Sequence, residues 1–272
     1  MTTASARRAP APIEFGQVEL DLLSTHAGVP LPFPLRVPSF GRIAGEREVL
    51  LATAGHTLRL RGFADEDGPA GAAGELVTAL RQHRGTVDLV LVDETGVTAV
   101  VAIVYRSWAL ICVQRLDNDP AQPVRIHRVA ADALTDALLD LIPDVAPART
   151  MPITLPERAV ATAGQLVGEI EDDREKEQRL RALVRDCGGD PNALDQLAGL
   201  LAVLTGRGQV GATRRGAGES TRAGAELSWL DGPRGRVRVV PAKHGWVSVN
   251  PMRPNDVRFA VEDLARIARE PR

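Results

Sequence analysis

The sequence predicts an α+β protein of two pseudosymmetric halves, each with helices and an antiparallel β meander. Three observations carry this prediction. An Arg-Gly pair precedes a strand-like run in each half, at 84–85 and again at 207–208. A further apolar run then surrounds a tryptophan, Trp108 in the first half and Trp246 in the second. An amphipathic segment follows in each half, VAADALTDALLDLI and DVRFAVEDLARI, and its spacing is typical of a helix.

The first half begins with helical patterns around an extended arm. Residues 1–11 are small, basic and proline-containing, so we expect them to be disordered. A helix is predicted over 14–27, with Gly28 as its stop signal. The next segment, VPLPFPLRVPS, has four prolines that fix an extended backbone and remove donors, which predicts a surface arm or an extended edge. Two more helices are predicted over 45–61 and 70–83.

A three-strand meander and a helix are predicted next. Residues 86–92 alternate between apolar and polar, whereas 100–104 are continuously apolar, as in a strand covered on both faces. The polar segment Asp93-Glu94-Thr95-Gly96 predicts a hairpin turn between them. The third strand surrounds Trp108, and a helix is predicted over 130–141. A proline-rich linker then places the boundary between two domains, 12–147 and 148–272, which we expect to form one compact unit.

The second half repeats this order. Helices are predicted over 156–170, over EDDREKEQRLRALVRDC, and over 192–204, where Asp190-Pro191 supplies an N-cap and a first-turn proline. Strands follow, and the alternation over 236–239 predicts valines facing the core and arginines facing water. We expect both Trp108 and Trp246 to fill core positions.

Composition sets limits on the class of protein. The chain has 272 residues, 44% hydrophobic and 25% charged, with a net charge of −2, so a globular protein without an overall attraction for nucleic acid is expected. Its two cysteines do not form a disulfide framework. No apolar run reaches the length of a membrane span, and the N-terminus lacks the apolar core of a signal peptide. A cytoplasmic protein is therefore expected.

No cluster of residues indicates catalysis, a metal or a cofactor. The five histidines have no shared helical spacing, and no phosphate-binding loop or hydrolase motif is present. Cys112 with His127 as a base is the one nucleophile pair to consider, although Cys112 lies in an apolar strand pattern and is expected to be buried. We therefore predict a protein that is not an enzyme and that has no catalytic, cofactor-binding or metal-binding residues.

A basic surface in the second half leaves an alternative function open. Basic residues outnumber acidic ones from residue 207 onward, and several arginines lie on or beside predicted strands: Arg214, Arg215, Arg222, Arg236 and Arg238. Phosphate groups favour such a surface, so a nucleic-acid-binding or regulatory protein is the alternative. No aromatic ladder accompanies these arginines, which makes nucleic-acid binding the less favoured reading.

The chain resembles the EspG family, the secretion-associated proteins of actinobacterial type VII (ESX) systems, from about Phe15 to Ile267. The resemblance rests on LPFPLRVPSFGRIAGERE, on RGQVGATRR, and on a D-x-P-x-G-R pattern followed by GWVSVNP. In this chain the D-x-P-x-G-R residues are Asp231, Pro233, Gly235 and Arg236. The family has a pseudosymmetric α+β fold, so the resemblance agrees with the fold that the pattern predicts.

The resemblance implies a cytosolic chaperone that binds a PPE-type helical secretion substrate, with its PE partner, and keeps it soluble for export. The family's contacts, carried over by position, imply partner-binding residues at the first-half turn, Asp93, Glu94, Thr95 and Gly96. They imply a second region at Arg207, Gln209, Arg214 and Arg215. Mycobacterial members often have a long flexible loop where this chain has a tight turn, so the docking mode is left open here, as is a homo-oligomer.

Overall fold

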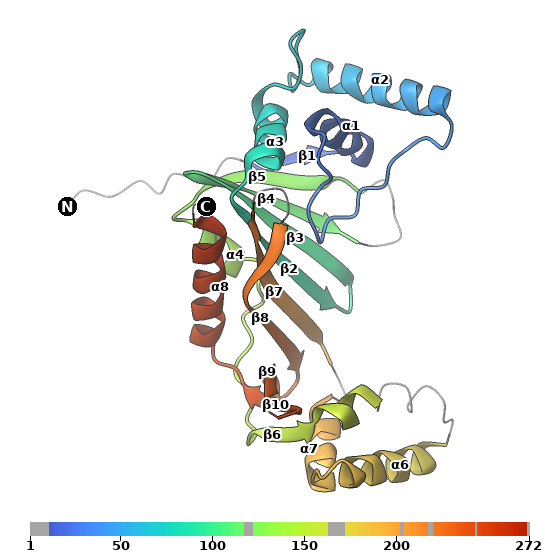
Figure 1. The fold of residues 1–272 in the computed structure, drawn as a ribbon, viewed down its shortest axis with the longest axis vertical. Helices are drawn as coiled ribbons and strands as arrows, with labels where there is room; N and C mark the ends of the chain where they lie inside the picture. Colours follow the sequence, from blue (N-terminus) through green and yellow to red (C-terminus); the bar gives the residue numbers. More distant parts are fainter. Residues whose placement is uncertain are drawn as a thin grey trace, which may run out of the picture. The chain divides into compact units, whose positions relative to one another are not determined.

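The computed structural model describes residues 11–116, 122–162, 172–201, 204–216, 220–242 and 244–270. The chain divides into two compact units. The first contains Met1–Ile142, Val210–Glu226 and Val261–Arg272, and the second contains Pro143–Gln209 and Leu227–Ala260. Strands β7 (Gly206–Arg215) and β8 (Ser220–Gly232) and helix α8 (Pro254–Arg269) contribute residues to both units (Figure 1).

The first unit is built on an antiparallel sheet. Its strands hydrogen-bond in the order β1-β5-β4-β3-β2-β7-β8. The strands are β1 (Ile13–Phe15), β2 (Gly85–Asp93), β3 (Gly96–Tyr105), β4 (Trp108–Arg115) and β5 (Val124–Ala130), with the parts of β7 and β8 that belong to this unit. The central strand β3 is buried along most of its length, as its continuous apolar run predicts.

Helices cover both faces of this sheet. Val101, Ile103 and Cys112 pack against α1 (Gln17–Ala27) and α3 (Gly71–Gln82), and α2 (Ala44–Leu60) packs on α1 (Figure 1). The opposite face packs against the end of α8, where a Cβ on Gly85 would lie 2.9 Å from Cα of Ala268. The short helix α4 (Leu134–Leu139) contacts β5.

The second unit combines an antiparallel sheet with a helix pair. Its sheet has the order β8-β9-β10-β6, with β6 (Ile153–Pro156), β9 (Gly235–Ala242) and β10 (Trp246–Pro251). Helices α6 (Asp173–Asp186) and α7 (Pro191–Leu201) contact each other, and α7 also contacts β6. A small core of Ile153, Leu155, Val184, Val237 and Val249 joins the helices to the sheet.

The predicted α+β class with antiparallel sheets is confirmed, and several element predictions need correction. The helices over 45–61 and 70–83 and the first-half meander are present, but Val124–Ala130 forms a fourth meander strand where a helix was predicted to begin. Residues 13–15 form a strand ahead of α1. The predicted helix over 156–170 begins after β6, and its part from 163 on lies outside the described residues. The internal duplication and the domain boundary near 148 stay predictions.

Two predictions about individual side chains need correction. Trp108 is partly buried and packs against the core of the first unit, and Trp246 is only partly buried. Trp229, at 1% exposed, is the tryptophan that fills a core. Arg236 does not face water: it is 3% exposed and binds Asp231. A buried countercharge overrides the strand alternation at this position, because a paired and hydrogen-bonded arginine can be buried without an isolated charge.

Candidate functional site

The proline-rich arm of the first unit is fixed to the sheet and to helix α1 at two points. The side chain of buried Gln114 on β4 accepts from Arg36 N–H and donates to Arg36 O, both at 2.8 Å. Further along, Asp21 accepts from the Phe40 N–H at 2.8 Å and from Arg47 at 2.7 Å. Burial alone would raise the pKa of Asp21, but the hydrogen bonds from Arg47 and Phe40 outweigh it and hold the pKa low.

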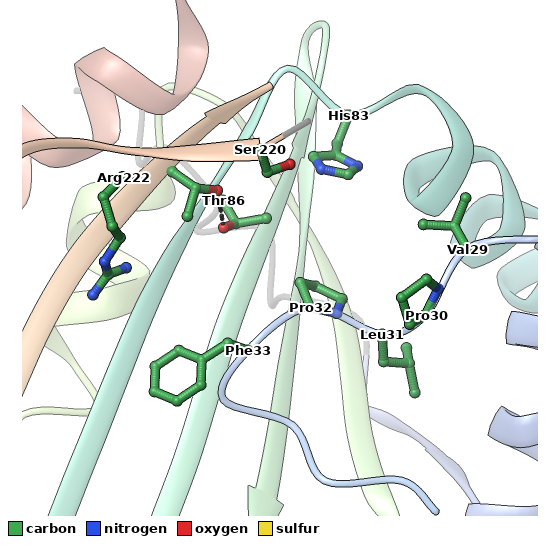
Figure 2. A pocket seen from close by; sticks show the side chains of 10 residues that line it. Val29, Pro30, Leu31, Pro32, Phe33, His83, Thr86, Ser220 and Arg222 are labelled. Carbon is green, nitrogen blue, oxygen red and sulfur yellow. Dashed lines mark hydrogen bonds between the residues drawn. The ribbon is translucent and has the colours of Figure 1, made fainter. Parts of the chain in front are cut away.

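Between the end of α1 and Arg36, the arm forms one wall of an open pocket of about 490 Å³ (Figure 2). The arm supplies apolar side chains, and the strands and the end of α3 supply polar ones. The lining residues are Val29, Pro30, Leu31, Pro32, Phe33, His83, Thr86, Thr213, Ser220 and Arg222. Phe33 is 65% exposed, an unusual position for a large aromatic side chain. All of these residues belong to the first unit.

The charged group of the pocket is already neutralised. Arg222 on β8 binds both carboxylate oxygens of buried Asp88 and also binds Glu226. Burial raises the pKa of Asp88, and the arginine opposes that shift. Gly211 makes room for this pair, because a Cβ there would lie 2.5 Å from Arg222 Nη2. The pocket therefore offers little free charge to a ligand.

The remaining polar groups of the pocket are hydroxyls and one imidazole. The hydroxyls of Thr86 and Thr213 hydrogen-bond to each other at 2.7 Å across β2 and β7 (Figure 2). His83, directly after α3, is 8% exposed. Burial and the charge of nearby Arg215 lower the pKa of His83, so the imidazole is neutral near pH 7.

The predicted first-half turn is present and well ordered. Asp93, Glu94 and Thr95 are exposed, and Asp93 pairs with Gly96 at the end of the β2–β3 hairpin. Asp93 accepts a hydrogen bond from the Thr95 N–H at 2.7 Å, and bonds from the Thr95 side chain and backbone lower the pKa of Asp93. Gly96 has φ of +127°, a conformation that favours glycine. The turn therefore presents a fixed tip with two carboxylates, Asp93 and Glu94, beside Arg115, which donates to Thr95.

The four predicted residues of the second region differ in their surroundings. Arg207 and Gln209 are exposed on the part of β7 that belongs to the second unit. Arg214 and Arg215 lie in the first unit, where Arg214 is 3.5 Å from the carboxylate of Glu270. Arg215 donates to Leu80 O at 3.1 Å and to Arg81 O at 2.6 Å, so it caps the end of α3.

The sequence analysis did not find the pocket as a site. Its arm was recognised from the prolines, but the pocket also needs residues from β2, β7 and β8, which lie 50 to 190 positions further along the chain. The spacing of Gly208 and Gly211 in RGQVGATRR was an available signal. Each glycine lies under a large side chain, Trp229 and Arg222 respectively, and so indicates a close approach on β7.

The structure separates the nucleophile pair considered from the sequence. His127 lies opposite Ile111, and Cys112 lies opposite Ile126, so the two side chains point to opposite faces of the sheet. Burial raises the pKa of the Cys112 thiol to about 12. Within the described residues, no group of three or more His, Cys, Asp or Glu side chains is placed to hold a metal ion. No described helix is long and apolar enough to cross a membrane.

Three of the five arginines behind the nucleic-acid alternative are paired within the protein. Arg236 is buried against Asp231, and Arg222 binds Asp88 and Glu226. Arg215 donates hydrogen bonds to the carbonyl oxygens at the end of α3. Phosphate binding relies on cations that face solvent, and these three contacts make such a surface smaller than the sequence indicates; Arg214 is exposed and lies 3.5 Å from the Glu270 carboxylate.

Fold and site together define an α+β protein with an open apolar pocket and an exposed aromatic residue at its edge, features of a binding module. The EspG family model matches residues 17–263, which is most of the chain, and the chain belongs to the EspG family. No protein with a curated description matches the sequence.

A solved structure has the same fold. It is the Mycobacterium tuberculosis type VII secretion system chaperone EspG5 in complex with a PE25–PPE41 dimer. The TM-score is 0.64 at 14% sequence identity, and the alignment covers 94% of this chain and 96% of EspG5. At this identity the likeness establishes the fold, and the α+β architecture expected from the sequence is confirmed.

Proposed function

We propose that this chain is a cytoplasmic chaperone or adaptor of a type VII (ESX) secretion system. It binds a PPE-type helical substrate together with its PE partner and keeps that substrate soluble for export, without covalent chemistry. Family membership over residues 17–263 supports the proposal, as does the EspG5 complex, which has the same fold. The observation that carries it is local: Leu31, Pro32 and Phe33, which belong to the segment on which the resemblance rests, form part of the apolar wall of an open pocket.

The chemistry of this pocket suits a partner that must be shielded from water. An apolar wall with an exposed phenyl ring gains free energy when a second apolar surface covers it, at roughly 25 cal/mol per Å². The neutralised Arg222 and the neutral His83 avoid the desolvation cost of a free buried charge. A stable complex buries on the order of 1,600 Å², more than one pocket provides.

Additional contacts are therefore part of the proposal. We assign them to the tip Asp93, Glu94, Thr95 and Gly96, and to the exposed side chains of Arg207, Gln209 and Arg214. Arg215, also expected at the interface, contributes by holding the end of α3 beside the pocket. Long-range attraction between the charged tip and a basic partner surface accelerates association more than it adds affinity.

Co-expression with neighbouring PE-like and PPE-like reading frames tests the function. We expect a partner to become soluble and to co-elute with this chain in size-exclusion chromatography. Phe33→Asp is expected to weaken the complex by tenfold or more, because it places a charge on the apolar wall. Leu60→Asp is the matched control, since Leu60, on α2, is also a large exposed apolar residue, at 76% against 65% for Phe33. The proposal fails if no PE or PPE protein gains solubility or co-elutes.

A further inference from the structure

The His83 imidazole lines the pocket, and its two ring nitrogens have different surroundings. Its Nδ1 lies 3.1 Å from both Ala79 O and Leu80 O, and carbonyl oxygens only accept hydrogen bonds. The Arg215 Nη1 lies further from Nδ1, at 3.4 Å, and donates to Leu80 O and Arg81 O instead. Nδ1 therefore carries the ring proton, and in the neutral ring Nε2 keeps a lone pair.

That lone pair has no hydrogen-bond partner among the described residues. The buried side-chain atoms that lack a partner there are Trp229 Nε1 and Arg238 Nε, so His83 Nε2 is accessible to solvent although the residue as a whole is 8% exposed. His83, Thr86 and Ser220 supply polar groups to the lining of the pocket, and the arm residues supply apolar ones (Figure 2). An apolar ligand that covered this nitrogen without donating a hydrogen bond would bind about tenfold more weakly. The occupant must therefore bring a donor.

The other properties of the pocket select among donors. A carboxylate is disfavoured because Arg222 already binds two carboxylates and the Nε2 lone pair repels a third. A lysine ammonium is disfavoured because the positive charge of Arg215 acts on His83 and the opposite wall is apolar. A serine or threonine hydroxyl leaves most of about 490 Å³ unfilled. Aromatic side chains with a polar handle have the remaining combination, a large apolar body and one N–H or O–H group.

We propose that the pocket lined by the 29–33 arm and His83 is the receptor for a tryptophan or tyrosine side chain of the partner, with His83 Nε2 accepting its ring N–H or O–H. This inference rests on the proposed function and specifies the anchor residue of the partner. Phe33, Pro32 and Leu31 contact the ring, and the Thr86–Thr213 pair borders its polar edge. His83 determines specificity, because aromatic rings that donate a hydrogen bond to it bind more tightly than rings without a donor.

The test uses indole and 1-methylindole as probes, in which a methyl group replaces the hydrogen on the ring nitrogen, with backbone NMR shifts of the full chain as the readout. Indole is expected to perturb Phe33, Thr86 and Thr213 and to bind about tenfold more tightly than 1-methylindole, the factor that one unsatisfied buried acceptor gives. In His83→Phe the two probes are expected to bind equally. In Phe33→Ala both are expected to weaken by the same factor.

A second measurement uses only the wild-type chain, so it does not depend on whether the variants fold. The ¹⁵N shifts of the His83 imidazole are expected to show a protonated Nδ1 and an unprotonated Nε2. A protonated Nε2, equal affinity of the two probes for the wild-type chain, or shifts confined to another surface would each overturn the proposal. If these experiments fail but a partner still co-elutes with the chain, the chaperone function is supported and only the proposed aromatic anchor is wrong.

Discussion

At the scale of single residues, the motif Asp231 to Arg236 has a physical explanation. The β8–β9 hairpin brings the two side chains together, with Arg236 Nε 2.6 Å and Nη2 2.8 Å from the Asp231 carboxylate oxygens. Arg236 also donates to Pro143 O at 2.9 Å, and its guanidinium lies 5.2 Å from the centre of the Trp229 ring. Every partner is internal, so the motif holds the second unit together.

Removing one partner of this pair is predicted to be costly. Arg236→Ala leaves the buried Asp231 carboxylate without its countercharge, and we expect a loss of about 3–5 kcal/mol in the free energy of unfolding. Urea unfolding followed by tryptophan fluorescence measures it. Arg234→Ala is the control, because Arg234 is exposed in the same hairpin and should change stability by less than about 0.5 kcal/mol. Equal losses for both variants would contradict the structural role.

Two glycines give a second prediction. A Cβ on Gly208 would lie 2.0 Å from the Trp229 ring, so Gly208→Ala must displace a fully buried indole. We expect a loss of about 1–3 kcal/mol, the usual cost of overpacking. Gly45 in α2 has no atom within 4 Å of the corresponding position, so Gly45→Ala should leave stability unchanged or add up to about 1 kcal/mol. Thermal unfolding of both variants measures these changes. A Gly208→Ala protein as stable as the wild type would contradict the packing of Trp229 against Gly208.

At the scale of elements, the helices with strong apolar periodicity were predicted and the weakly patterned strands were not. Residues 70–83 repeat apolar side chains at helical spacing, and α3 follows them closely. Val124–Ala130 reads VRIHRVA, whose alternation is short and carries two arginines, so β5 was missed and the next helix was begun too early. Its partner β4 imposes the extended conformation through the sheet, which local pattern does not reveal.

The pocket shows the same limit for the site. The four prolines predict an extended arm correctly, because proline restricts its own backbone. Which surface the arm faces depends on Gln114, 78 positions from Arg36 along the chain. Such a contact leaves no periodic signal in a single sequence. The turn Asp93 to Gly96 was predictable for the opposite reason, since its hydrogen bonds and its glycine are local.

The Gln114 contact leads to a prediction about the arm. Gln114→Met keeps the size of the side chain but leaves the Arg36 N–H and C=O without their partners, which should cost about 1–3 kcal/mol. Hydrogen exchange should accelerate at the Arg36 amide. The Phe40 amide, bound to Asp21, serves as the internal control and should stay protected. Unchanged protection at Arg36 would show that the arm is held by other contacts.

At the scale of the whole molecule, the compact units do not follow the order of the sequence. The first unit takes residues from three separate segments, and its sheet includes parts of β7 and β8 that follow β2 by more than 100 residues. The last turns of α8 supply Leu264, Ala265 and Ala268, all fully buried. A division near residue 148 would remove these segments from the first unit.

Because the first unit is assembled from separate segments, we can predict how fragments of the chain behave. A fragment of residues 12–147 lacks both the α8 residues that pack over Gly85 and the Arg215 side chain that caps α3, so it should expose apolar surface, bind a hydrophobic dye and unfold without a sharp transition. Co-expression with residues 148–272 should restore a soluble complex, because that fragment supplies the missing strands and helix. A full chain shortened only to residue 270 is the control and should unfold as the wild type does. A cooperative transition and a dispersed NMR spectrum for 12–147 alone would instead establish the sequence boundary as a true domain boundary.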